Sequence, residues 1–224
     1  MPIIKAVVQA PTNISFSDGD EVNCVAGKQA ELLVANAHSE LYTQTYRGSV
    51  FHASTTPLGL AIPIYSSATP LVVLWNPIGS GKNLSLQNLV FAYASGTAAY
   101  GAVGLMYEVN TGSNIATGAP FSAFSASAPI NGLVGSGLAS VAKVSISGTN
   151  TLTTAGNAGR WLYTLGNINL EAATGTAHAT YTPGAGAQIK GQIILAPGSA
   201  IWMACTVAST ALYAQTLTWS EVPI

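Results

Sequence analysis

The chain has 224 residues, enough for one large all-β domain or a compact pair of smaller domains. Apolar residues make up 49% of it and charged residues only 7%, with a net charge of -1 and a mean hydropathy of +0.39. This composition excludes disorder, because disordered chains combine few apolar groups with strong net charge. The small net charge also disfavours nucleic-acid binding, because it provides too little field to hold a phosphate backbone.

Charge is distributed unevenly along the chain. Residues 1–56 hold eight charged side chains, whereas residues 57–224 hold only seven. We interpret residues 1–56 as an N-terminal arm and residues 57–224 as a β-sandwich domain. Within the arm, helical periodicity predicts one short helix near residues 38–46.

Short β-branched and aromatic runs, separated by Gly and Pro, predict many short strands in the rest of the chain. The strand candidates, in chain order, are residues 71–75, 84–86, 89–93, 103–109, 141–146, 161–170, 188–195, 201–207 and 212–221. This number of short strands predicts an all-β fold, a jelly-roll-like antiparallel β-sandwich with an N-terminal extension.

The segments between these strands are predicted to be turns and loops. Residues 111–137 and 172–187, low in charge and rich in small residues, are expected to be long loops. Pro197 and Gly198 suit a tight turn before a last hairpin, in which residues 208–211 form the connection.

Long neutral stretches, such as residues 48–81 and 109–142, do not predict membrane spans. Gly, Pro, Asn, Ser and Thr interrupt both stretches every few residues, so neither offers about twenty consecutive apolar side chains. The opening residues, Met1 to Lys5, lack a basic region, and we expect no signal peptide. Cys24 and Cys205 are too few for a disulfide framework and are interpreted as buried thiols.

The segment Gly79-Ser80-Gly81-Lys82 resembles part of a phosphate-binding loop, but the pattern is incomplete. A P-loop requires Gly where this chain has Asn76, and Ser or Thr where it has Asn83. We therefore predict a tight turn with an exposed Lys82, and expect Lys82→Ala to leave folding and assembly nearly unchanged.

Other candidate chemistry is weak. His38-Ser39-Glu40 matches half of a zinc deaminase signature, whose cysteine half is absent. The acidic patch of Asp18, Asp20 and Glu21 is interpreted as a solvated turn, and calcium binding by these residues remains an open alternative. We predict no catalytic, cofactor or metal site, and no enzymatic activity.

Two further sets of residues bear on sugar chemistry. A glycosidase would need a facing pair of carboxylates, and three acids lie in the strand region: Glu108, Glu171 and Glu221. Surface positions are the simpler expectation for these acids. Aromatic faces can stack on sugars, but core packing is expected for the four tryptophans, Trp75, Trp161, Trp202 and Trp219.

With so few charged residues, the surface must consist mainly of neutral polar and apolar side chains. A freely diffusing monomer benefits from more charge, whereas interface cores are depleted of it. The composition therefore favours a chain that packs against copies of itself or a scaffold.

Four segments are distinctive when taken together: Gln29-Ala30-Glu31-Leu32-Leu33-Val34 with His38, Tyr46-Arg47-Gly48-Ser49-Val50-Phe51, Leu74-Trp75-Asn76-Pro77-Ile78-Gly79-Ser80-Gly81-Lys82-Asn83-Leu84, and Trp219-Ser220-Glu221-Val222-Pro223-Ile224. They resemble a group of tailed-bacteriophage virion structural proteins, from about Gly27 to the C-terminus. The most specific pieces are the Asn-Pro-x-Gly-Ser-Gly-Lys-Asn turn and the terminal Trp-x-Glu-x-Pro. The resemblance implies a place in the virus particle and no catalytic residue.

This resemblance leads to an expected function. We expect a capsid decoration protein made in the host cytoplasm, a homotrimer that contacts the major capsid protein or other virion proteins. Its arm would reach a neighbour or the capsid lattice, and neither nucleic acid nor membrane is expected as a partner. The alternative is a receptor- or glycan-binding protein at a phage tail or fibre tip.

Overall fold

The computed structural model describes residues 39–97, 99, 101–109, 121–146, 150–152, 160–168 and 185–224. By compactness the chain divides into residues Met1–Thr43 and Gln44–Ile224. A short helix α1 (Tyr42–Tyr46) is the one described helix, and it lies inside the predicted range. All other described elements are strands, and the described strands pair antiparallel, which confirms the all-β prediction.

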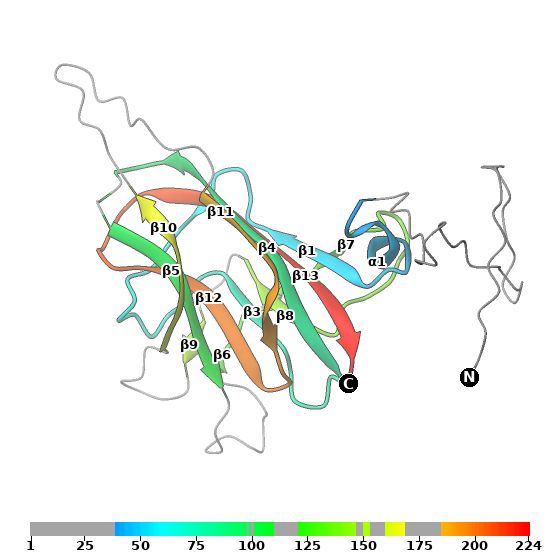
Figure 1. Ribbon diagram of the computed structural model, residues 1–224. Coiled ribbons are helices and arrows are strands. Elements are labelled where there is room, and N and C mark those ends of the chain that lie inside the picture. The colour runs from blue at the N-terminus through cyan, green and yellow to red at the C-terminus, as the bar shows by residue number, and fades with distance from the viewer. Residues whose placement is uncertain are drawn as a thin grey trace, which may run out of the picture. The chain divides into compact units, whose positions relative to one another are not determined.

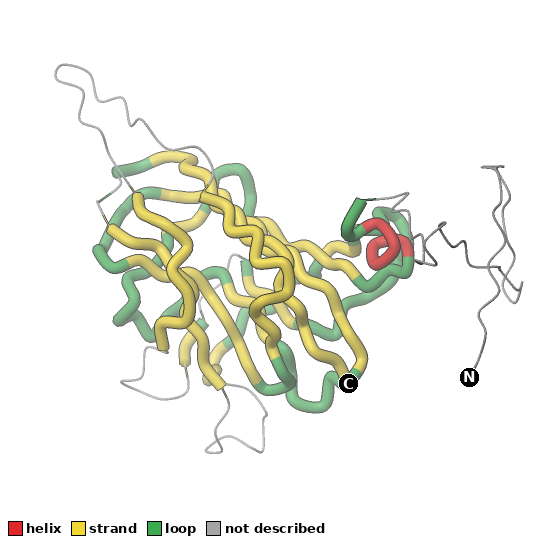
Figure 2. Tube along the Cα trace, viewed as in Figure 1, coloured by secondary structure: helices red, strands yellow, loops and turns green. Residues whose placement is uncertain are grey.

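Two sheets form the sandwich (Figures 1 and 2). The first has the order β11-β4-β13-β1-β7, with β2 also paired to β13. Its strands are β1 (Val50–Ser54), β2 (Leu60–Ala61), β4 (Lys82–Ser95), β7 (Ile130–Asn131), β11 (Ala185–Leu195) and β13 (Leu212–Pro223). The second has the order β10-β5-β12-β3-β8, made of β3 (Val73–Trp75), β5 (Gly101–Val109), β8 (Lys143–Ser145), β10 (Arg160–Ile168) and β12 (Ser199–Cys205). A small third sheet pairs β6 (Phe121–Ala123) with β9 (Thr151–Leu152).

Four of the strand pairings, made by eight strands, are nested. The first strand, β1, pairs with the last, β13, and β3 pairs with the second-last, β12. Further in, β4 pairs with β11, and β5 pairs with β10. The chain therefore pairs like one long hairpin that has been folded over into two sheets.

The main core lies between the two sheets and is built by alternation along the strands. In β4, Leu84 and Leu86 point into the core, and after a shift of register so do Leu89 and Phe91. The shift places the extra residue Gln87 on β4, opposite the step from Thr218 to Trp219. What the sequence suggested as two separate extended segments is therefore one bulged strand.

A second, smaller core covers the outer face of the second sheet. Strand β12 is buried on both faces: Ile201 and Met203 belong to the main core, whereas Trp202 packs in the second core with Phe121 and Leu152. The predicted strand at residues 71–75 behaves in the same way, because Val73 and Leu74 are buried in different cores. The third sheet supplies this outer cover.

Three sequence-based expectations need correction. The arm predicted over residues 1–56 includes β1, which pairs with β13 over five residues and so belongs to the sandwich. The loop predicted over residues 111–137 contains β6 and β7 in its described part, because Phe121 and Asn131 are buried anchors. Residues 172–184, most of the second predicted loop, lie outside the described residues.

The third correction concerns the end of the chain. A turn does occur at Pro197 and Gly198, where Ser199 N donates to Ala196 O at 3.2 Å. However, β12 and β13 do not form a hairpin, because they belong to different sheets. The connection between them crosses from one layer of the sandwich to the other.

Candidate functional site

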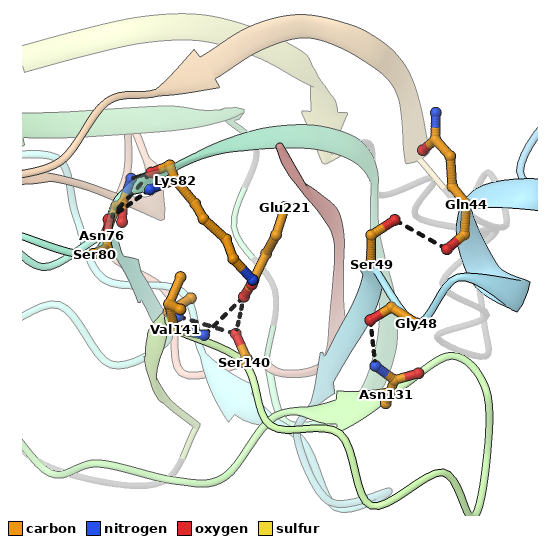
Figure 3. Close-up of polar contacts among 11 residues, drawn as sticks. Gln44, Gly48, Ser49, Asn76, Ser80, Lys82, Asn131, Ser140, Val141 and Glu221 are labelled. Atoms are coloured by element: carbon orange, nitrogen blue, oxygen red, sulfur yellow. Dashed lines mark hydrogen bonds and ion pairs between the residues drawn. The ribbon is translucent and has the colours of Figure 1, made fainter. Parts of the chain in front are cut away.

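A buried carboxylate lies at the end of the core where the C-terminal strand finishes. The Glu221 side chain is fully buried, and its Oε2 accepts a bond from Lys82 Nζ at 2.7 Å (Figure 3). Its Oε1 accepts from Ser140 Oγ at 2.5 Å and from Val141 N at 2.9 Å. Both carboxylate oxygens are thereby used for structure, because an unpaired buried charge would be costly.

The turn before β4 is closed by Asn76, whose side chain is buried. Asn76 Nδ2 donates to Lys82 O at 2.8 Å and to Leu195 O at 2.9 Å. On the backbone, Asn76 N donates to Ser199 O and Gly198 N donates to Asn76 O. Asn76 thus joins its own turn to the turn that follows β11.

A second polar group lies before β1. Asn131 Nδ2 donates to Gly48 O at 2.7 Å, and Ser49 Oγ donates to Gln44 O at 2.9 Å (Figure 3). The backbone O of Ser49 accepts from Glu221 N at 2.8 Å. The segment that begins β1 is therefore tied directly to the end of β13.

These contacts bring three of the four distinctive segments together at one end of the sandwich; the fourth, residues 29–38, lies outside the described residues. The Asn-Pro-x-Gly-Ser-Gly-Lys-Asn turn and the Trp-x-Glu-x-Pro ending meet through Lys82 and Glu221. We call the set Asn76, Lys82, Ser140 and Glu221 the clasp. The turn motif and the C-terminal motif lie far apart in the sequence, but they meet in the fold through the ion pair of Lys82 and Glu221.

The clasp shows what surrounds the segment that resembles part of a phosphate-binding loop. A strand, β4, follows the glycines, and Lys82 Nζ faces a carboxylate. The prediction of a turn is confirmed, with Gly79 and Gly81 at φ of 80° and 67°. The prediction of a simply exposed Lys82 is wrong, because its side chain is 36% exposed and ion-paired.

The remaining candidates for chemistry divide into two groups. His38, Asp18, Asp20, Glu21, Cys24 and Glu171 lie outside the described residues. Within the described part of the chain, no group of three His, Cys, Asp or Glu side chains lies close enough together to hold a metal ion. Nor does the described part contain a helix long and apolar enough to cross a bilayer.

Cys205 is buried in the main core as predicted, and it is a free thiol. Its Sγ lies 2.9 Å from Val207 O and 3.2 Å from Ile62 O, and its single S–H donates toward these carbonyls. Burial raises the pKa of this thiol, which opposes formation of the reactive thiolate.

The tryptophans follow the core prediction with one exception. Trp202 and Trp219 are fully buried, and Trp75 packs against Phe121 and Phe124. Trp161 lies on the edge strand β10 and is 36% exposed. Its ring covers Gly104, where a Cβ would be only 2.2 Å from Trp161 Cζ2.

An apolar groove of about 460 Å³ is lined by edge strand β11 of the first sheet and by β5, β12 and Leu162 of edge strand β10 in the second. Its walls include Val109, Leu162, Ile193, Ile194 and Ile201. Ile194 is 60% exposed, which is high for an isoleucine beside a core. This groove could not be predicted from the sequence, because it depends on which strands become the edges of the two sheets.

Comparisons with protein-family models, with curated proteins and with solved structures gave no match.

Proposed function

We propose that this protein is a structural component of a tailed-phage virion, a decoration protein that coats the head by packing in many copies. The observation that carries the proposal is the neutrality of the body: residues 57–224 contain seven charged side chains. Two of these, Lys82 and Glu221, neutralise each other in the clasp. A surface so poor in charge suits burial against neighbours.

The chemistry of the described residues supports this proposal. The most specific motifs form the clasp, where they close the fold. A protein of this kind works by presenting a stable surface. We expect this protein to pack as trimers on the virion.

The nested strand pairing supports a more specific fold within the sandwich class. Eight strands paired first to last, in two antiparallel sheets, are the connectivity of a jelly roll, the fold common among viral capsid domains. We infer a jelly roll built from β1, β3, β4, β5 and β10 to β13.

The number of copies in purified particles tests the proposed function. A decoration protein should be present at hundreds of copies and should rebind to particles from which it has been stripped. A few copies per particle, located at the tail in a density map, would contradict the head assignment.

One observation favours the alternative, a glycan-binding protein at a tail tip. Trp161 and the neighbouring Tyr163 are both partly exposed on β10, and aromatic faces suit sugar rings. Binding to a panel of bacterial surface glycans, lost in Trp161→Ala, would support this role. Leu58→Ala, at another exposed position, is a suitable control for loss of an exposed apolar side chain. Trp219→Phe is unsuitable, because Trp219 is buried in the core.

A further inference from the structure

The sandwich carries two apolar features at opposite edges. The groove described above is lined by β11 together with β5, β12 and Leu162 of β10, on the side of the sandwich where β10 and β11 are the outermost strands of the two sheets. On the other side the outermost strands are β7 and β8, and the segment of residues 132–142 connects them. We call residues 132–138 of this segment the apolar loop.

The apolar loop presents bulky side chains to solvent. Val134 is 85% exposed and Leu138 is 51% exposed, with Leu133 partly exposed beside them. The segment contains no charged residue. Exposed apolar side chains that lie together, rather than singly, are typical of a contact surface.

Hydrogen bonds hold the apolar loop in one conformation. Leu133 N donates to Asn131 Oδ1 at 2.8 Å, Ser136 N donates to Leu133 O at 3.0 Å, and Gly132 N donates to Val50 O at 2.8 Å. Asn131 is itself buried and bonded to Gly48. A loop fixed in advance loses little entropy when it binds, which favours association.

We propose that the apolar loop of one copy inserts into the groove of the next copy, so that the copies join head to tail. The apolar loop and the groove match chemically, because both are aliphatic and neither contains a charged side chain that would be buried on binding. The groove and the apolar loop lie at opposite sides of the sandwich. Each copy can therefore insert its loop into one neighbour and accept the loop of another. A heterologous contact of this kind closes into a ring or extends as a filament. This proposal rests on the self-association within the proposed function and specifies its interface.

Cysteine crosslinking tests the contact directly. In a Cys24→Ser background, the double variant Val134→Cys/Ile194→Cys should form intermolecular disulfides that join successive copies, with a three-copy ring as the expected end product. Each single variant should yield at most a two-copy species. Failure of the double variant to crosslink under oxidising conditions, although the protein is oligomeric in solution, would overturn the proposed interface and leave the self-association standing.

Charge insertion provides an independent test with the full chain. Val134→Asp and Ile194→Asp should each weaken association about tenfold or more, measured by analytical ultracentrifugation, because each buries an unpaired carboxylate. Leu58→Asp, at another exposed position, is the matched control and should leave association unchanged. Equal association of all three variants and the parent would overturn the proposal, as would a monomeric parent. If the parent protein is monomeric in solution but abundant on virions, the proposed interface is wrong and the proposed function is unaffected.

Discussion

Lys82 and Glu221 show how a single ion pair can be more than surface decoration. Because Glu221 is fully buried and Lys82 is partly exposed, loss of Lys82 leaves a carboxylate without its counter-charge. We expect Lys82→Met to lower the free energy of unfolding by about 1–3 kcal/mol, measured in urea. This replaces the sequence-based expectation that Lys82→Ala changes little.

A double variant makes that prediction sharper. Lys82→Met/Glu221→Gln removes both charges and keeps an amide that can still accept from Ser140 and Val141. It should be more stable than Lys82→Met alone, because the uncompensated charge is gone. If the loss of stability in the double variant equals the sum of the losses in Lys82→Met and Glu221→Gln, the two side chains are not coupled.

His52 contributes a dependence of stability on pH. Its Nδ1 lies 2.9 Å from Thr218 Oγ1, and burial lowers the pKa of His52 below its ordinary value of 6.5. The unfolded chain therefore binds a proton at this residue more readily than the folded chain does. Stability should fall as the pH decreases below about 6.5, towards the lower pKa of the folded state.

The comparison with His52→Gln isolates this effect from the other histidines. The variant should lose part of the decrease in unfolding free energy between pH 7 and pH 5, while its stability at pH 8 changes less. Identical pH profiles for parent and variant would show that His52 does not titrate differently in the two states.

At the scale of elements, Asn76 decides how two turns are held together. Asn76→Ala would leave the carbonyls of Lys82 and Leu195 without their buried donor. We expect a loss of about 1–3 kcal/mol in unfolding free energy, because unpaired buried acceptors are costly. Thermal unfolding of the variant measures this loss.

Gly81→Ala is the companion variant for the same turn. A Cβ at Gly81 meets nothing within 4 Å, so only its φ of 67° opposes the substitution. The expected cost is about 1 kcal/mol from the left-handed backbone. A cost for Gly81→Ala well above that of Asn76→Ala would mean that backbone strain, more than the buried amide, controls the turn.

The strands of the sandwich core were predictable from sequence, and their partners were not. Local apolar patterns predict strands in runs such as Val103 to Val109 and Leu212 to Glu221. Short strands such as β2 and β7 carry no such pattern and exist because a neighbouring strand is within reach. The same distinction explains why a hairpin was expected between β12 and β13, although each has a better partner in its own sheet.

The clasp was partly visible in the sequence. Lys82 and Glu221 stand nearly alone as charges in long neutral stretches, and isolated charges in such surroundings tend to be paired. Their pairing with each other depends on β4 lying beside β13, a contact between residues 139 positions apart. No local rule connects positions at that separation.

For the whole molecule, the last prediction concerns the charged N-terminal residues. Charges at 5, 18, 20 and 21 lie before the first described strand, which begins at Val50, so deleting residues 1–23 removes no strand of either sheet. We expect the deleted protein to fold with an unchanged β-type circular dichroism spectrum and an unfolding midpoint close to that of the parent. Its binding to particles should be much weaker, because placed charges give specificity at an interface.

Full occupancy of stripped particles by the truncated protein would show that the body alone carries attachment. The matched control keeps residues 1–23 and replaces Asp18, Asp20 and Glu21 with their amides, which removes charge without shortening the chain. If charge is the cause, this variant should bind as poorly as the deletion, and both should lose less at high salt than at low salt relative to the parent. Normal binding by the amide variant together with weak binding by the deletion would assign the contribution to the apolar residues of the segment instead.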